Sequence, residues 1–273
     1  MVLQPAVIYL GRDAHTYPLA IPIERSWRPA LRATEFEFRY RFFIIAAVFF
    51  GGFWCYAVDH VNVSQMLVER FLPHTAETGA LTERHLVQIL LGMGALLTIL
   101  AALIRTWAAA YLQSEVVHDS TLHAEGLVAD GPYRHVRNPL YLGGVLFAIG
   151  FGMAASRLGF VVIVGGLTLF YYRLIAREES KLKETQGESY RQFLKAVPRL
   201  IPSLRPRLPS GGLVPRWGQA FAGETFMWFF ALAAVSFAVT LNQRLFLTMI
   251  VAGIAASLLA KAVLQRRGQP NTP

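Results

Sequence analysis

The sequence contains little cysteine and little charge. Cys55 is the one cysteine among 273 residues and lies in an apolar run, which excludes an intramolecular disulfide and a cysteine-based metal cluster. Charged residues make up 16% of the chain and hydrophobic residues 54%, so the chain is more apolar than a soluble globular domain needs to be. The formal charge of +9 is distributed between apolar runs and not along a basic stripe with interleaved aromatics, which argues against a nucleic-acid partner. The composition therefore predicts an integral membrane protein in a lipid bilayer.

Apolar runs of nearly membrane-spanning length define the expected fold. A helix needs about 20 apolar residues to cross about 30 Å of hydrocarbon. Six runs approach this length, at residues 42–58, 86–104, 140–155, 158–175, 226–241 and 245–260. The third run is rich in glycine and only two residues separate it from the fourth, which predicts a tight Gly-rich hairpin with closely approaching backbones. The expected fold class is all-α: a polytopic membrane bundle of about six transmembrane helices with a cytoplasmic C-proximal segment.

Basic residues predict the orientation of these spans, because cytoplasmic segments carry an excess of lysine and arginine. Residues 59–85 hold only Arg70 and Arg84, whereas residues 173–224 carry ten basic side chains. The segment before the first run also carries several arginines: Arg12, Arg25, Arg28, Arg32, Arg39 and Arg41. Both termini and residues 105–139 and 176–224 are therefore expected in the cytoplasm, in a multi-pass protein of a bacterial inner membrane or an equivalent.

The stretch "GPYRHVRNPLYLG", residues 131–143, gathers basic side chains at the start of the third run. Pro139 suits the first position of a helix, with Asn138 as the expected N-cap. Arg137 and Tyr141 would then stand at the membrane entrance. The pattern predicts that polar chemistry is concentrated at the cytoplasmic rim of the bundle.

The fourth run continues as a helix past the expected bilayer surface. Good helix formers extend to Gln186, where Gly187 is expected to end the helix. Glu178 shares one face with Tyr171 and Leu174, so it should point toward the bundle and lie beside Arg137 and Tyr141. Beyond Gly187, an apolar stripe predicts an interfacial helix that lids the resulting pocket: Tyr190, Phe193, Leu194 and Val197.

Three segments in order, "GPYRHVRNPLYLG", "REES" and "GESYRQFLKAVPRLIP", resemble the isoprenylcysteine carboxyl methyltransferase family, which includes phospholipid N-methyltransferases. The family pattern is Arg-His-Pro-x-Tyr followed some dozens of residues later by Glu-Glu. The resemblance covers residues 105–202. It divides the chain into an N-terminal segment (1–41), two spans (42–104), a methyltransferase core (105–202), a linker (203–225) and two last spans with a tail (226–273).

The resemblance implies an enzyme that binds S-adenosyl-L-methionine at the cytoplasmic rim and takes a lipidic or prenylated small-molecule substrate from the bilayer. Cofactor-binding positions carry over to residues of the motif and the acidic pair: Arg137, Asn138, Pro139, Tyr141, Glu178 and Glu179. Catalytic roles carry over to Arg137 and Glu178. Asn138 departs from the family's histidine, and because an amide hydrogen-bonds without titrating near neutral pH, a binding role is expected for it.

Other interpretations of these residues remain open. Phospholipid N-methylation is an alternative within the family, and an NADPH-dependent sterol-type ene-reductase is an alternative of another class. If these residues form no cofactor site, Arg137 is an anchor at the membrane interface. Glu178 and Glu179 are then the solvated end of a helix. The "GMG" at residues 92–94 is similar to a Gly-x-Gly described for phospholipid methyltransferases, or it is a packing feature. His118 and His123 are five residues apart and unsuited to one helical face, so no metal site is expected.

Overall fold

The computed structural model describes residues 32–71, 82–112 and 129–268, and within them it is helical without a strand. The order of elements is α1 (Glu35–Arg39), α2 (Arg41–Trp54), the 3-10 turn η2 (Cys55–Ala57), α3 (Val63–Phe71), α5 (Glu83–Tyr111), the 3-10 turn η3 (Gly131–Arg134), α7 (Pro139–Gly152), α8 (Arg157–Ala196), α9 (Trp217–Gly223), α10 (Thr225–Thr240) and α11 (Gln243–Gly268). All six apolar runs are helical, which confirms the all-α expectation.

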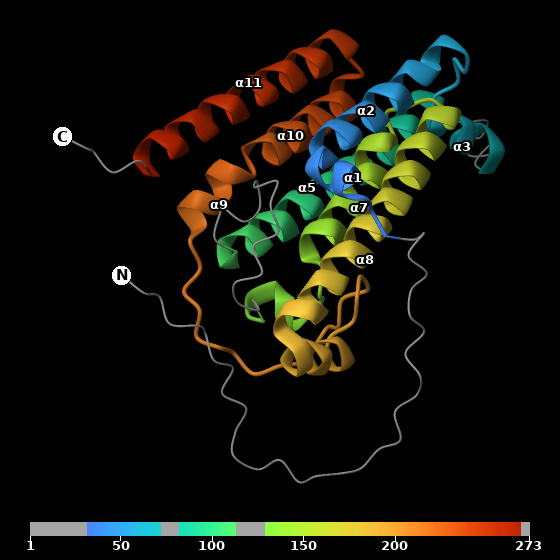
Figure 1. Ribbon diagram of the computed structural model, residues 1–273. Helices are drawn as coiled ribbons and strands as arrows, with labels where there is room; N and C mark the ends of the chain where they lie inside the picture. The colour runs from blue at the N-terminus through green and yellow to red at the C-terminus, as the bar shows by residue number, and fades with distance from the viewer. Residues whose placement is uncertain (1–31, 72–81, 113–128, 269–273) are drawn as a thin grey trace.

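The helices form a bundle in which α7 lies between α5 and α8 (Figure 1). α2 packs along α8, and α10 lies between α5 and α11. Aromatic rings fill the centre, where Phe147 of α7 stacks on Phe230 of α10 and Phe151 of α7 packs against the same ring at a tilt. Because α7 has helices on several sides, its first turn is held from several directions.

The expected number of six spans is not confirmed. Three helices are long and apolar enough to cross a membrane, α5, α8 and the Gln243–Ala260 part of α11. The pair α9 and α10, bent by 61°, makes a fourth if it counts as one broken span. α2 and α7 each have 14 residues, which at 1.5 Å per residue is about 21 Å and less than the hydrocarbon thickness.

The glycine-lined contact expected between the third and fourth runs is not confirmed, because α7 makes its closest backbone approach to α5. A Cβ on Gly150 would lie 2.3 Å from the carbonyl oxygen of Gly94, so glycine is required there. Toward α8, the space above Gly144 is taken by the ring of Tyr171. Glycine on that side makes room for a side chain and not for a second backbone.

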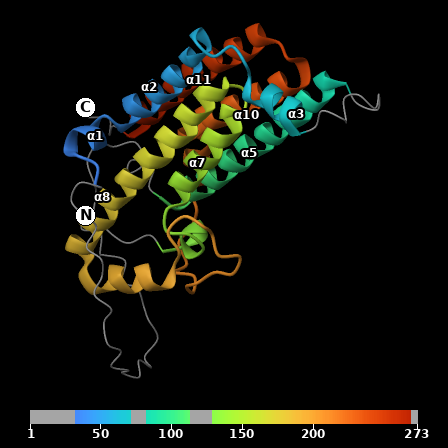
Figure 2. The same ribbon diagram turned by 90° about the vertical axis from the view of Figure 1, so that its right-hand side faces the viewer.

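α8 breaks at Gly187, as the sequence predicts. Gly187 has φ +56° and ψ −125°, and the remaining part of the helix turns across the end of the bundle (Figure 2). The predicted interfacial stripe is wrong as to its partner, because Tyr190, Phe193 and Val197 are buried against Ala129 and Leu208 of the protein itself. This tail therefore folds onto the loops around η3.

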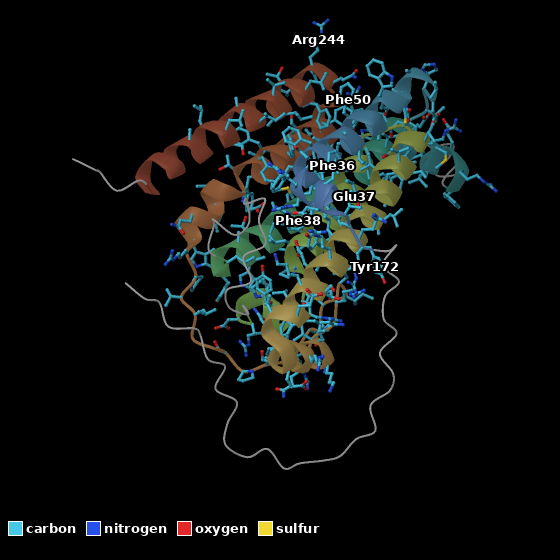
Figure 3. The ribbon with its side chains drawn as sticks, in the orientation of Figure 1. Phe36, Glu37, Phe38, Phe50, Tyr172 and Arg244 are labelled. Carbon is cyan, nitrogen blue, oxygen red and sulfur yellow. The ribbon has the colours of Figure 1, made fainter. Side chains whose placement is uncertain are left out.

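The N-terminal part of the described chain lies against α8. In α1, Glu37 pairs with Arg173 at 2.8 Å, and Figure 3 shows Glu37 and Phe38 on this short helix. Arg244, also labelled, projects from the end of the bundle opposite the α8 break. The expected cationic residues Arg12, Arg25 and Arg28, and His118 and His123, lie outside the described residues.

Candidate functional site

The motif residues form a compact turn followed by the start of α7. Asp130 caps η3 by accepting from the amide of Gly131 at 2.9 Å, and Pro139 occupies the first position of α7. Asn138 stands at the N-cap position but makes no capping hydrogen bond with its side chain. Its amide nitrogen donates to the carbonyl oxygen of Arg199 at 3.2 Å. The predicted helix start is confirmed, and the capping role of the Asn138 side chain is wrong.

Basic side chains of the turn bind a segment that follows α8, residues 198–208, here called the strap. Arg134 Nε donates to the carbonyl oxygen of Leu208 at 2.7 Å, and His135 Nδ1 to that of Ser203 at 2.9 Å. The backbone amide of Arg137 donates to the carbonyl oxygen of Pro198 at 2.8 Å. The crowding of basic residues at 134–137 thus has a local cause, since two of their side chains and one backbone amide donate to strap carbonyls.

Glu179 is the centre of the site's charge network. Its carboxylate, 4% exposed, accepts from Arg137 Nη1 at 3.1 Å. Arg199 of the strap donates to the same carboxylate through Nε at 3.2 Å and also through Nη2. The guanidinium of Arg199 also lies over the ring of Tyr172, 5.3 Å from its centre. One buried carboxylate therefore joins α8, the motif turn and the strap.

Glu178 faces α7, as its helical position predicts. The hydroxyl of Tyr141 donates to Glu178 Oε1 at 2.6 Å, and the rings of Tyr141 and Tyr171 are 5.6 Å apart. This hydrogen bond fixes the first turn of α7 against α8. The two adjacent carboxylates thus have different partners, Glu179 two arginines and Glu178 a phenol.

Two buried polar atoms of the site have no hydrogen-bond partner within the described part of the chain, Tyr133 Oη and Arg137 Nε. Burial raises the pKa of Tyr133, so its hydroxyl stays protonated and available as a donor. Unsatisfied buried donors are costly, by about 1–3 kcal/mol each. Both atoms are therefore suited to a ligand that offers oxygen acceptors.

All six predicted site residues come together where the first turn of α7 meets the middle of α8, and Glu178 lies beside Tyr141 as the sequence predicts. Sequence reasoning missed Arg199 as a member of the network and did not place the buried Tyr133 hydroxyl at the site. The signal for Arg199 was present, because it lies in the quoted segment "VPRLIP". No group of three His, Cys, Asp or Glu side chains arranged to hold a metal occurs among the described residues.

Asp130 binds the residues that directly follow the strap. It accepts from the hydroxyl of Ser210 at 3.1 Å and from the amide of Leu213 at 3.0 Å, in addition to Gly131. Burial acts to raise the pKa of Asp130, but these donors outweigh it, so the pKa lies below its ordinary value of 3.8. The carboxylate therefore stabilises the fold above about pH 4, and that contribution is lost as the pH falls through the lower pKa of the folded state.

We expect Asp130→Asn to lower the stability of the folded protein by about 2 kcal/mol at pH 7, because the amide replaces a charged acceptor that serves three donors. Thermal unfolding in detergent at pH 7 and at pH 3 measures this. The difference between variant and parent should shrink at pH 3, because the unfolded carboxylate, with its ordinary pKa of 3.8, is then mostly protonated. A difference that is the same at both pH values would contradict the role of its charge.

Comparisons with known proteins match the part of the chain that carries the motif turn and the two adjacent carboxylates, Glu178 and Glu179. Residues 89–189 match the family model described as phospholipid methyltransferase. A stretch of 80 residues is 39% identical to the protein-S-isoprenylcysteine O-methyltransferase of Schizosaccharomyces pombe, which is 28% of this chain and 33% of that protein. The chain thus spans about a third of the length of the curated relative it matches. No solved structure matches. The resemblance expected from the sequence is confirmed over this segment.

Proposed function

We propose that this protein is a membrane-embedded methyltransferase that uses S-adenosyl-L-methionine and acts on a lipidic or prenylated substrate. The observation that carries the proposal is the convergence of Tyr141 on Glu178 and of Arg137 on Glu179 inside the family-matched segment. These are the residues that the family pattern assigns to the cofactor site. Arg137 and Glu178 are the proposed catalytic residues, and Asn138, Pro139, Tyr141 and Glu179 complete the proposed cofactor site.

The residues present suit the cofactor's polar groups. Arg137 Nε and the Tyr133 hydroxyl are buried donors without partners in the described chain, and they match the cofactor's carboxylate and ribose oxygens. Glu178, whose Oε1 accepts from the Tyr141 hydroxyl, offers carboxyl oxygens suited to an ammonium or a sulfonium. When bound, the cofactor supplies an electrophilic methyl group. The chain's own contribution is orientation and exclusion of water, which in well-oriented systems is of the order of 7–11 kcal/mol.

The chemistry of the methyl acceptor decides whether a base is needed. A carboxylate acceptor, as the resemblance to carboxyl methyltransferases implies and the relative's O-methyltransferase name allows, reacts without one. An amine acceptor, as in the phospholipid N-methyltransferases that the motifs also resemble, needs a base where it arrives protonated. The second candidate function is therefore phospholipid N-methylation at the same site.

Placement in the bilayer is part of the proposal. α2 presents strongly exposed aromatic rings on its outer face, Phe43, Phe50 and Trp54, and rings at this position suit lipid contact better than water. We propose six crossings, with α2 and α7 as short spans, and the site on the cytoplasmic side. The excess of basic residues in 173–224 supports this orientation.

Arg137→Lys should weaken binding of S-adenosylhomocysteine by about 10- to 100-fold. The guanidinium of arginine is a planar fork that can bind Glu179 and a ligand at the same time, and the ammonium of lysine lacks this geometry. Isothermal calorimetry of purified protein with S-adenosylhomocysteine, and separately with NADPH, measures this. The parent should bind the former and not the latter.

The control for this variant is Lys181→Gln, a loss of one exposed charge on the same helix as Glu179. It should bind the ligand like the parent. Tight NADPH binding without a response to S-adenosylhomocysteine would overturn the methyltransferase proposal in favour of a reductase. Unchanged affinity in Arg137→Lys would make Arg137 an interface anchor.

A further inference from the structure

A second buried ion pair lies beside the site and outside the motif. Arg105 of α5 donates from Nε to Glu224 Oε2 at 2.8 Å and from Nη2 to Oε1 at 2.9 Å. Glu224 is fully buried, and it occupies the break between α9 and α10. This residue lies beyond residues 89–189, which match the methyltransferase family. The pair therefore ties a C-terminal helix pair to the matched core.

The guanidinium of Arg105 also reaches the motif helix. Nη1 donates to the carbonyl oxygen of Leu140, at 3.2 Å, in the first turn of α7. All three nitrogens of Arg105 are thus engaged, two with Glu224 and one with α7. A lysine has no planar fork and cannot reproduce this arrangement.

Gly143 allows the Arg105 side chain to cross α7. A Cβ on Gly143 would lie 2.4 Å from Arg105 Cγ, so the stem of the arginine occupies the space left by the missing side chain. The neighbouring Gly144 leaves room for the Tyr171 ring in the same way. Consecutive glycines thus place Arg105 on one side of the first turns of α7 and Tyr171 on another.

Burial of such a pair does little for net stability. The desolvation of two charges offsets their attraction, and an apolar pair of similar volume is often as stable or more so. What the pair does supply is direction, because the bidentate geometry fixes the orientation of the guanidinium. Its effect is therefore expected in the position of α7 rather than in the total free energy of unfolding.

We propose that Glu224 is a positioning residue for the cofactor site. It orients Arg105, Arg105 holds the Leu140 carbonyl, and the first turn of α7 is thereby kept where Tyr141 reaches Glu178. The helices after the strap, which the family match does not include, then contribute to the site through one side chain. This inference rests on the proposed function, since the site it positions is the proposed cofactor site.

A matched control exists at the same helix interface. Thr106, next to Arg105 on α5, accepts a hydrogen bond from Trp228 Nε1 of α10 at 3.0 Å. Thr106→Val removes this contact between α5 and α10 with nearly unchanged volume and leaves Leu140 untouched. Any effect of merely loosening this interface should appear in this variant too.

The test compares four proteins: the parent, Glu224→Gln, Thr106→Val, and a double variant. The double variant carries both Arg105→Met and Glu224→Leu, so it replaces the whole ion pair by apolar side chains. Two quantities are measured in detergent: affinity for S-adenosylhomocysteine, and amide hydrogen exchange of residues 140–144, which needs no ligand. Glu224→Gln should lose at least about tenfold in affinity, since small misplacement of binding groups is costly, and exchange at 140–144 should accelerate. The double variant should regain thermal stability but not affinity or exchange protection.

Parent-like affinity and exchange in Glu224→Gln or in the double variant would overturn the positioning role. So would Thr106→Val matching Glu224→Gln in both measurements. A parent that does not bind S-adenosylhomocysteine would contradict the proposed function, and the exchange of residues 140–144 would still decide whether Glu224 positions α7.

Discussion

Glu179→Gln is expected to abolish measurable binding of S-adenosylhomocysteine and to lower the free energy of unfolding by about 3 kcal/mol. The carboxylate, 4% exposed, is the shared partner of Arg137 and Arg199. A neutral amide leaves two partly buried guanidinium groups close together and removes the charge of Glu179 from between them, and removal of one partner from a buried ion pair costs about 3–5 kcal/mol. Mutual repulsion should then separate the strap from the motif turn. Calorimetric titration and thermal unfolding in detergent measure both effects.

The control for this variant is Glu188→Gln, the same substitution nine positions further along α8, just beyond its break at Gly187. Glu188 pairs with Arg191 at 3.4 Å in an exposed i,i+3 contact, with a side chain 62% exposed. Such surface pairs contribute about 0–1 kcal/mol, so stability and affinity should stay close to the parent's. If Glu179→Gln behaved like Glu188→Gln, the charge network would not hold the site together.

Helix positions were largely predictable from the sequence because they depend on local patterns. Apolar run length located the main helices, Pro139 marked the start of α7 and Gly187 the break in α8. The number of membrane spans was not predictable in this way. The length of an apolar run does not show where a 3-10 turn such as Cys55–Ala57 will end the helix. The partner of the stripe at Tyr190 was also misassigned. An apolar face looks alike whether it faces lipid or, as here, a loop of its own chain.

The site was predictable where residues were linked by a known spacing and not where the chain returns from a distance. Tyr141 and Glu178 follow from the family pattern and a shared helix face. Arg199 and Glu224 do not, because each depends on how the strap and the last helices fold back over α7. Arg199 was counted among the basic residues that predict membrane topology, and Glu224 lies in the expected linker just before the fifth apolar run. The structure instead buries the carboxylate of Glu224 and joins Arg199 to Glu179.

The two glycines of "GMG" in α5, Gly92 and Gly94, have different surroundings. Gly94 faces the backbone of Gly150, and a Cβ on either one would lie within 2.6 Å of the other's carbonyl oxygen. Gly92, two residues earlier, would meet nothing within 4 Å. Gly150 lies nine positions beyond Tyr141 on α7, about 14 Å along the helix axis. In "GMG", Gly94 is thus a packing glycine and Gly92 an open position. The packing contact of Gly94 lies away from the motif turn.

Gly150→Ala should therefore lower the free energy of unfolding by about 3 kcal/mol. The added methyl group would press against the Gly94 carbonyl and force α5 and α7 apart. The backbone of Gly94 cannot rotate away from this contact as a side chain could. Gly92→Ala, the same substitution in open space, should be neutral or stabilise by about 0.5–1 kcal/mol, since alanine restricts the unfolded chain and favours the helix. Thermal unfolding of the two variants in detergent measures this contrast, and S-adenosylhomocysteine titration accompanies it. Gly92→Ala should bind the ligand like the parent; a tenfold loss of affinity there with intact stability would instead place the cofactor against "GMG".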